Sequence, residues 1–250
     1  MKISVVIPTY KQSEKTIRNI KEKVLPYFDS TGVTYEVLIE EDHNLPDELS
    51  ILQEGMKDMP AQVKLDVWKE GDGKGKGAAV RRGILNSDAD YVLFFDADLA
   101  TDLSIFDLMK KDLGKYDACI ASRDCEGSVY VQKQPLKRRL THWGGRKVVR
   151  WKFHMKEVSD SQCGYKMFRL PLAKEMARRQ TIFGFAFDVE YLYFMHLNGK
   201  SIKEYPAKWE DDPDSSLKKL WGTTKRFYKD LGLIKKNKEH YLLKDNEHAD

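Results

Sequence analysis

Strand-like and helix-like segments alternate through the first half of the chain, and this alternation limits the fold more than any other feature of the sequence. Apolar, β-branched runs predict strands over residues 3–7, 35–39, 63–68 and 91–95. Helices are expected between them over residues 12–25, 46–56 and 78–85, and the first should end before Pro26. A further helix and strand are expected before Arg123. This order predicts an α/β fold whose largely parallel sheet is flanked by helices.

The second half of the sequence is less regular. A basic aromatic stretch covers residues 132–156 and is interrupted at Gly144 and Gly145, and a polar loop over residues 158–169 leads into a strand. A helix is expected over residues 186–197 and a strand over residues 202–209. We therefore expect one α/β domain over residues 1–212 and a basic helical tail over residues 213–250, which contacts a membrane peripherally or is partly disordered.

The composition excludes several classes of protein. Hydrophobic residues make up 41% of the chain, which is enough for a buried core, and the 33% of charged residues are mixed in sign, unlike those of a disordered chain. Three cysteines, an odd number, favour free thiols over a disulfide framework or a zinc site. No apolar run reaches the length of a membrane-spanning helix, and the N-terminus has no signal-peptide pattern.

Polar side chains follow four of the expected strands. These side chains are Thr9 and Tyr10 after the first strand, Glu40, Glu41 and Asp42 after the second, a glycine-rich loop after the third, and Asp96 and Asp98 after the fourth. Ligands of open α/β sheets bind at the carboxyl ends of the strands. Four such strand ends therefore predict one binding site at this edge of the sheet.

Asp96-Ala97-Asp98 is the sharpest of these signals. Two carboxylates that flank one residue can approach a single hard cation, and Mg²⁺ or Mn²⁺ held there would bridge them to phosphate oxygens. The apolar residues before Asp96 predict a buried strand that holds the pair rigidly. A solvated turn is the alternative interpretation, but the other polar strand ends favour a metal site.

The glycine-rich loop over residues 71–77 precedes an expected helix and is typical of an anion-binding loop. Its backbone N–H groups, together with Lys74 and Lys76, could face a phosphate. The loop does not match the P-loop pattern, and it follows the third strand, whereas the dinucleotide-binding fingerprint follows the first. A flexible, solvated turn remains the alternative.

Seven motifs in order carry a resemblance to a known family. They are SVVIPTY, EVLIEEDHN, GKGKGAAVRRGI, FFDADLATDL, SDSQCGYKMFR, FAFDVEYL and the segment over residues 209–217. Over about residues 2–220 the chain resembles inverting family 2 glycosyltransferases, and among them the polyprenyl- or dolichyl-phosphate β-glucosyltransferases and their mannosyl relatives. The resemblance implies a GT-A fold over residues 1–212, with a Rossmann-like, mixed, mostly parallel sheet, helices on both faces, and a basic amphipathic C-terminal part.

The resemblance also implies roles for individual residues. On the donor side, it places in the nucleoside pocket Pro8, Thr9, Tyr10, Glu41 and Asp42. It places Asp96 and Asp98 at the metal and diphosphate, and Lys74 and Lys76 in a loop over the donor. It places Arg123 at the acceptor phosphate, and around the acceptor and the sugar it places Asp160, Gln162, Lys166, Asp188 and Glu190. The chain departs from the family at His43-Asn44, where Gly-Ser is common. It also has Ala100 where mannosyl relatives often carry Gln, which puts a third metal ligand in doubt.

The expected reaction is a metal-dependent, inverting transfer of a sugar, glucose favoured, from a nucleotide sugar, UDP favoured, to polyprenyl or dolichyl phosphate. A phosphate monoester is already a nucleophile at neutral pH, so positioning by Arg123, with Arg138 or Arg139, would do most of the work. Asp98 would help to stabilise the departing diphosphate. If the acceptor were a saccharide or protein hydroxyl instead, Asp160 or Asp188 would have to act as a base.

Two other functions fit less well. A sugar-1-phosphate nucleotidyltransferase would need a Gly-rich basic loop directly after the first strand, where this chain has Pro8-Thr9-Tyr10. A non-enzymatic binding module would leave Asp96, Asp98 and the glycine-rich loop unexplained.

Basic segments over residues 132–156 and 218–236 predict a membrane surface as a partner. The first holds nine Lys or Arg residues and no acidic residue, with Leu136, Leu140 and Trp143 at helical spacing. Packing of these apolar residues on the core is the alternative, and no nucleic-acid module is recognisable. We therefore expect a cytoplasmic protein that lies peripherally on the cytoplasmic face of a membrane.

Overall fold

The computed structural model describes residues 1–131, 136–210 and 220–244, and the side chains of 136–143 and 220–223 are outside this description. The first half consists of β1 (Lys2–Thr9), α1 (Ser13–Asn19), η1 (Ile20–Val24), α2 (Leu25–Ser30), β2 (Thr34–Glu41), α3 (Pro46–Met56), β3 (Val63–Val67), α4 (Lys76–Asn86), β4 (Tyr91–Phe95), α5 (Ile105–Met109), η2 (Lys110–Asp112) and β5 (Ala118–Ser122). The second half consists of β6 (Val129–Tyr130), α6 (Leu136–Phe153), β7 (Tyr165–Arg169), α7 (Leu170–Arg179), α8 (Phe187–Leu197), β8 (Ile202–Pro206), β9 (Lys208–Trp209), α9 (Leu220–Lys236) and η4 (Lys238–Tyr241).

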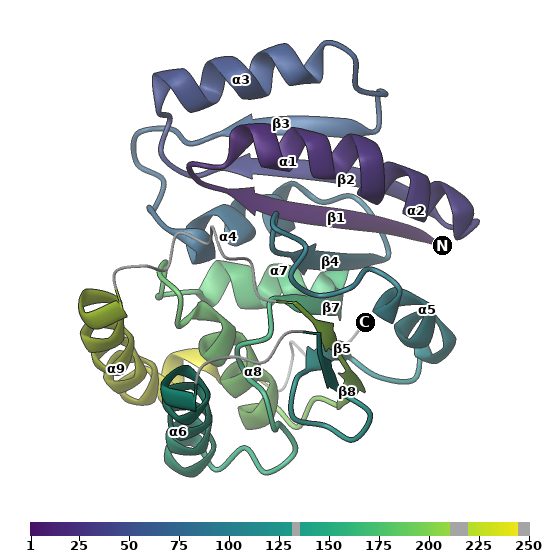
Figure 1. Ribbon diagram of the computed structural model, residues 1–250. Coiled ribbons are helices and arrows are strands. Elements are labelled where there is room, and N and C mark those ends of the chain that lie inside the picture. The colour runs from purple at the N-terminus through teal and green to yellow at the C-terminus, as the bar shows by residue number, and fades with distance from the viewer. Residues whose placement is uncertain (132–135, 211–219, 245–250) are drawn as a thin grey trace.

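One seven-stranded sheet organises the molecule (Figure 1), with the strand order β3-β2-β1-β4-β7-β5-β8. β7 is antiparallel to both of its neighbours, β4 and β5, and the other pairs in the sheet are parallel. A short parallel pair, β6 and β9, forms a second sheet. The predicted mixed, mostly parallel sheet is confirmed.

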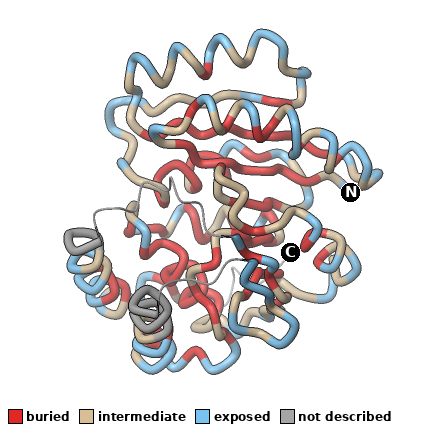
Figure 2. Tube along the Cα trace, viewed as in Figure 1, coloured by how far each residue is buried: buried red, intermediate tan, exposed pale blue. Residues whose placement is uncertain are grey.

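Helices cover both faces of the sheet, because the strands are apolar on both sides. On one face, Val6 and Phe94 pack with residues of α4, α7 and α8. On the other face, Val5 and Phe95 pack with residues of η1, α2, α3 and α5. The buried residues therefore run along the strands and line the inner sides of these helices (Figure 2).

Three local predictions need correction. The first helix does not stop before Pro26: a π-helical stretch, η1, leads into α2, where Pro26 lies in the first turn and its missing N–H is tolerated. Helix α6 runs through Gly144 and Gly145, because Val149 and Phe153 beyond them are buried in the core. The single strand expected over residues 202–209 is divided into β8 and β9, which belong to different sheets.

The C-terminal segment packs against the main body of the protein. Leu231 and Ile234 of α9 are buried, as is Tyr241 of η4, and all three belong to the core cluster that includes α8. Residues 211–219, where the predicted boundary at residue 212 falls, lie outside the described part of the chain, so that boundary stays a prediction. Among the described residues, no helix is long and apolar enough to cross a membrane.

Candidate active site

The parallel register of β1 and β2 brings the expected nucleoside pocket together. Pro8 lies opposite Glu40, and Thr9 lies opposite Glu41. The Tyr10 ring, just beyond β1, lies against the ring of His43, with 4.4 Å between the two ring centroids. An aromatic platform therefore stands at the ends of β1 and β2, where a base could stack.

The two acidic residues after β2 shape the surrounding loops. Glu41 accepts hydrogen bonds from the backbone N–H groups of His43, at 2.9 Å, and Asn44, at 2.6 Å. Asp42 accepts one from Gly75 N at 2.7 Å, so it ties the glycine-rich loop to β2. Burial raises the pKa of Asp42 above its usual value, although the Gly75 N–H and His43 act in the opposite direction.

The C-terminal part of the glycine-rich loop packs against Phe183, whereas Gly71 and Lys74 are exposed. The carbonyl oxygen of Phe183 accepts hydrogen bonds from Gly77 N, at 2.9 Å, and Ala78 N, at 3.3 Å. A Cβ atom on Gly73 would lie 2.6 Å from the Phe183 ring, so this position requires glycine. The N–H groups of Gly75, Gly77 and Ala78 are thus bound to protein oxygens, and this part of the anion-cradle prediction is corrected.

The two loop lysines lie in different surroundings. The Lys74 ammonium is 4.2 Å from the centroid of the Trp68 ring, which is a cation–π contact. The Lys76 ammonium is 2.5 Å from Asp96 Oδ1. Burial acts to lower the pKa of Lys76, but the charges of Asp96, Asp188 and Asp98 outweigh it and raise that pKa. Lys76 therefore stays charged among the carboxylates at the end of β4.

Asp96 and Asp98 leave β4 as predicted, and the loop before β7 makes room for them. Asp96 N donates to Gly164 O at 3.2 Å, and a Cβ atom at Gly164 would lie only 2.2 Å from Asp96 Oδ2. Asp98 Oδ1 accepts a hydrogen bond from Ala100 N at 3.0 Å. The Asp96 carboxylate can therefore occupy this position only because residue 164 has no side chain.

The chemistry of this pair suits Mg²⁺ or Mn²⁺, which proteins often hold with one or two carboxylates while substrate phosphates and water supply the other ligands. Among the described residues, no group of three or more His, Cys, Asp or Glu side chains is placed to hold a metal ion. Asp96 and Asp98 thus fit a cation that arrives with a diphosphate better than one held by the protein alone.

A second lysine–aspartate pair lies beneath the site. Lys166, on β7, is fully buried and its ammonium is 2.5 Å from Asp188 Oδ1, at the start of α8. It also donates to the Cys163 carbonyl oxygen at 2.6 Å. Glu190, two residues after Asp188, accepts hydrogen bonds from the hydroxyl groups of Thr181 and Tyr241, each at 2.6 Å. Lys166 and Asp188 thus lie together below the site, whereas Glu190 anchors the C-terminal segment.

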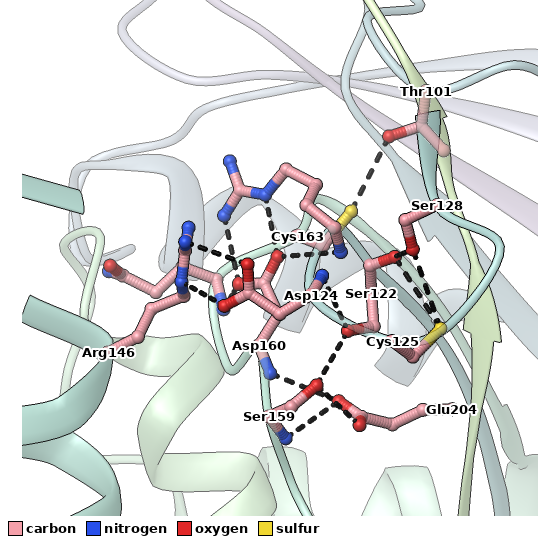
Figure 3. A network of polar contacts seen from close by, with 12 residues as sticks. Thr101, Ser122, Asp124, Cys125, Ser128, Arg146, Ser159, Asp160, Cys163 and Glu204 are labelled. Carbon is pink, nitrogen blue, oxygen red and sulfur yellow. Dashed lines mark hydrogen bonds and ion pairs between the residues drawn. The ribbon is translucent and has the colours of Figure 1, made fainter. Parts of the chain in front are cut away.

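Four charged residues from three distant segments lie together: Arg123, Asp124, Arg146 and Asp160. We call them the acceptor cluster after the role expected for Arg123, and Figure 3 shows Asp124, Arg146 and Asp160 among their polar contacts. Arg123 Nε donates to Asp160 Oδ2 at 2.6 Å, and Arg123 Nη2 donates to Asp160 Oδ1 at 2.9 Å. Gln162 N donates to the same carboxylate at 3.1 Å. Although burial opposes it, Arg123 holds the pKa of Asp160 well below its usual value. The pair is therefore fixed and ionised.

The loop that carries Asp160 connects the acceptor cluster to Asp96, one of the two carboxylates expected to hold a metal ion. At the beginning of this loop, Asp160 accepts hydrogen bonds from Arg123, and at the end of the loop Gly164 contacts Asp96. Between them, the Cys163 thiol lies 3.6 Å from Thr101 Oγ1. Only three residues of chain therefore separate Asp160, on the expected acceptor side, from Gly164, on the expected donor side.

Several charged residues at the site had no signal in the sequence analysis. Arg146 lies in the basic stretch, which predicts a surface, and Asp124 belongs to no motif of the sequence. Arg82 is also new: its Nε lies 3.3 Å from Glu40 Oε2, 3.5 Å from Asp66 Oδ2 and 3.9 Å from Asp72 Oδ2. Because three carboxylates share one guanidinium, the most buried acid cannot be well compensated, and burial raises the pKa of Glu40 to about 9. Arg138 and Arg139 lie in the stretch of α6 whose side chains are outside the description.

The sequence profile of glycosyl transferase family 2 matches residues 4–176 of the chain. Among curated proteins, the chain is similar to a dolichyl-phosphate beta-glucosyltransferase of Drosophila melanogaster, at 27% identity over 88% of this chain and 71% of that protein. It is also similar to the Homo sapiens dolichyl-phosphate beta-glucosyltransferase, at 28% identity over 88% of this chain and 70% of that protein.

Solved structures extend the comparison to the fold. Glucosyl-3-phosphoglycerate synthase from Mycobacterium tuberculosis superposes with a TM-score of 0.68 at 13% identity, covering 93% of this chain and 79% of the other. S. aureus TarS superposes with a TM-score of 0.55 at 16% identity, covering 96% of this chain and 68% of the other. With its fold, its strand-end acids and a family match over most of its length, the chain belongs to glycosyl transferase family 2 and is a glycosyltransferase of the GT-A fold.

Proposed function

We propose that this glycosyltransferase moves glucose from UDP-glucose to polyprenyl or dolichyl phosphate, with inversion and with Mg²⁺ or Mn²⁺ as cofactor. One observation carries the choice of a phosphate acceptor. Both carboxylates that could deprotonate a hydroxyl, Asp160 and Asp188, are buried and paired with a cation, Arg123 and Lys166 respectively. A carboxylate held in this way is a poor base, whereas a phosphate monoester needs none, because it is already ionised near neutral pH.

The names of similar proteins support the same choice. The Drosophila and human relatives are named as dolichyl-phosphate beta-glucosyltransferases. The mycobacterial synthase shares only the fold, but its structure contains UDP, Mn²⁺ and a glucosylated phosphate compound, which makes these ligands reasonable candidates.

The residues at the site divide the work between donor and acceptor. Tyr10 and Asp42 lie where the nucleoside would bind, and Lys76 lies where its ammonium can contact a diphosphate. A cation held by Asp96 and Asp98 would offset the charge that develops on the departing diphosphate. Arg123 would orient the acceptor phosphate, whose oxygen forms the new bond to the anomeric carbon as the bond to the diphosphate breaks. Attack opposite the leaving group inverts that carbon.

The acceptor lipid would be met at a membrane surface, peripherally and on the cytoplasmic side. In the described part of α6, Trp151 is 78% exposed and is flanked by exposed Arg150 and Lys147. On α9, Tyr228 and Leu233 are exposed among lysines. These features suit an anionic lipid surface, and they support a role for residues 213–250 as a membrane-contacting part of the chain. The segments over residues 132–135 and 211–219 lie outside the described residues.

The decisive experiment offers the purified protein a panel of UDP- and GDP-sugars with Mn²⁺ or Mg²⁺, with and without a short-chain polyprenyl phosphate. Mass spectrometry of the lipid fraction identifies the sugar transferred. We expect hexosyl-lipid phosphate only when donor, metal and lipid phosphate are all present, and we expect Asp98→Ala to abolish it. Donor hydrolysis without lipid product would move the acceptor to a hydroxyl, and the absence of metal-dependent donor binding would refute the proposal.

A further inference from the structure

Arg146, on α6, is buried beside Arg123 and Asp160 and yet leaves hydrogen-bond donors unused. Its side chain is 8% exposed, and its Nη2 donates to Asp124 Oδ1 at 2.9 Å. Its Nε lies 2.5 Å from Asp124 Oδ2 as an ion pair, but neither Nε nor Nη1 makes a hydrogen bond with a residue in the described part of the chain, although both atoms are buried. Buried guanidinium N–H groups without an acceptor are costly. Arg146 thus has unused capacity for an anion.

The two carboxylates of the acceptor cluster are held unequally. Asp160 is fully buried and receives hydrogen bonds from the backbone and the guanidinium of Arg123 and from Gln162 N. Asp124 is 30% exposed, and burial, together with the nearby charge of Asp160, raises its pKa above the usual value despite Arg146. Asp124 is therefore the carboxylate that a stronger anion can displace most easily.

Arg123 alone is poorly equipped to bind a phosphate monoester. Its Nε–H and one Nη2–H are already donated to Asp160. A phosphate monoester carries three terminal oxygens and up to two negative charges, and planar guanidinium groups bind it best through two parallel N–H donors. Arg146 carries a second guanidinium, whose Nε and Nη2 face Asp124, so this pair of donors becomes available to a phosphate when the Asp124 carboxylate moves away. It also lies close enough for its charge to act on Asp160.

We propose that Arg146 is a second arginine of the acceptor site, which binds the phosphate monoester of the acceptor, and that Asp124 holds its guanidinium in place until the phosphate replaces the carboxylate. The displaced Asp124 side chain would turn toward solvent, to which it is already partly open. This inference rests on the proposed function only in taking the acceptor to be a phosphate monoester.

The proposal predicts that substitutions of Arg146 and of Asp124 change the affinity for the acceptor in opposite directions. Calorimetric titration with short-chain polyprenyl phosphate, in the presence of UDP and Mn²⁺, measures the acceptor Kd without turnover. Arg146→Gln should raise this Kd about tenfold or more, because charge-assisted hydrogen bonds are lost. Asp124→Asn should lower it about threefold to tenfold, because the competing carboxylate loses its charge. If the pair were only structural, both substitutions would weaken binding, and that result would overturn the proposal.

Two further variants keep the test decisive. Arg146→Lys retains the charge beside Asp124 but not the guanidinium fork, so it should weaken phosphate binding several-fold with an unchanged unfolding midpoint. Unaltered binding by Arg146→Lys and Arg146→Gln would overturn the proposal even if Asp124→Asn failed to fold. Arg178→Gln, on the exposed surface of α7, removes the same charge elsewhere and should leave the Kd within about twofold.

The same titrations distinguish a lipid phosphate from a free phosphate compound. They also distinguish a failure of the proposed function from a failure of the role proposed for Arg146. Binding of polyprenyl phosphate but not of 3-phosphoglycerate or inorganic phosphate would identify a lipid acceptor, and equal binding of all three would identify a free phosphate compound. Arg146 holds the phosphate in either case. If the unaltered protein bound none of them, the proposed acceptor class would fail as well. If it bound them with no dependence on Arg146, only the present inference would fail.

Discussion

On the proposed donor side of the site, the Asp96 carboxylate is 37% exposed and has the Lys76 ammonium 2.5 Å from one of its oxygens. On the acceptor side, Asp160 is fully buried, and Arg123 binds both of its oxygens. The first pair joins the N-terminus of α4 to the end of β4, whereas the second joins two loops 37 residues apart.

This difference indicates different tasks for the two pairs. A half-exposed carboxylate paired with one flexible lysine can exchange its partner for a metal ion and a diphosphate at little cost. A buried bidentate pair cannot, because either charge left alone would be strongly unfavourable. The proposed donor side therefore holds exchangeable charges, and Arg123–Asp160 is a fixed framework on the proposed acceptor side.

The largest difference between the two pairs is expected when the carboxylate charge is removed from each, Asp160 in one and Asp96 in the other. Asp160→Asn should lower the free energy of unfolding by about 3 kcal/mol or more, because it leaves the Arg123 guanidinium buried without a counter-charge. Asp96→Asn should lower it by less than about 1 kcal/mol, since the carboxylate is partly solvated and Lys76 keeps Asp98 and Asp188 nearby. Chemical denaturation at neutral pH measures both values.

Acid unfolding of the unaltered protein provides the matching check. The pKa of Asp160 is held well below its unfolded value, so its contribution to stability is present above the unfolded pKa and is lost as the pH falls. Asp160→Asn should therefore flatten the acid limb of the stability curve. Equal losses from Asp160→Asn and Asp96→Asn would refute the distinction between fixed and exchangeable charges.

The donor half could be predicted closely from the sequence, because its signals are local. The ranges expected for β4 and α3 coincide with those in the structure, and the acids at the ends of β2 and β4 lie at one edge of the sheet. Buried parallel strands produce unbroken apolar runs, and the side chains that follow them must gather at one edge.

The acceptor half could not be predicted in the same way. Arg146 pairs with Asp124 across 22 residues, and no periodic pattern in the sequence signals that contact. Its place in a basic stretch suggested a solvated face, but the packing of Val149 and Phe153 into the core turns this side of α6 inward. Helix α7 was not predicted at all, although its Ala173 and Met176 are buried against the sheet. Long-range pairs depend on the assembled fold, and a single sequence does not reveal them.

A methyl group at position 164 should disturb the donor side without unfolding it. In Gly164→Ala the new Cβ atom would lie 2.2 Å from Asp96 Oδ2, so the carboxylate must rotate away, but a side-chain terminus can move at small cost in stability. We expect Mn²⁺-dependent UDP binding to weaken about tenfold to thirtyfold, equivalent to ~2 kcal/mol, while the unfolding midpoint changes little. Calorimetry and thermal denaturation measure the two quantities.

Gly145→Ala on α6 is the matched control, because a methyl group there meets no atom within 4 Å. As alanine favours a helix more than glycine does, this variant should gain roughly 0.5–1 kcal/mol of stability and bind UDP as before. If Gly164→Ala retained full metal-dependent binding, the geometry of Asp96 would not be critical on the donor side.

The two sides should also differ in how their buried acids respond to rising pH. Burial raises the pKa of Glu40 from 4.5 to about 9, so across that interval the unfolded chain has released a proton that the native protein retains. Glu40 therefore makes stability fall as the pH rises, opposite in sign to Asp160, by at most about 1.4 kcal/mol per pH unit. Glu40→Gln should flatten this decline, measured as the free energy of unfolding between pH 5 and pH 9.

Glu54→Gln on the exposed surface of α3 provides the control and should leave the slope unchanged. Parallel stability curves for the unaltered protein and Glu40→Gln would mean that Arg82 keeps Glu40 ionised. The donor side would then hold its buried acid in the same way as the acceptor side holds Asp160.

The smallest expected effect concerns the approach of the acceptor from a membrane. Trp151 is 78% exposed on α6, the helix that also carries Arg146 into the acceptor cluster. Partial immersion of its ring in the lipid interface should stabilise membrane binding by ~1 kcal/mol, so Trp151→Ser should lower binding to vesicles rich in anionic lipid about fivefold. Sedimentation with vesicles measures this change. Leu108→Ser, an exposed apolar change on α5, should have no such effect. If both variants bound vesicles as the unaltered protein does, α6 would serve the acceptor site through Arg146 alone, and the lipid would have to reach Arg123 by another face.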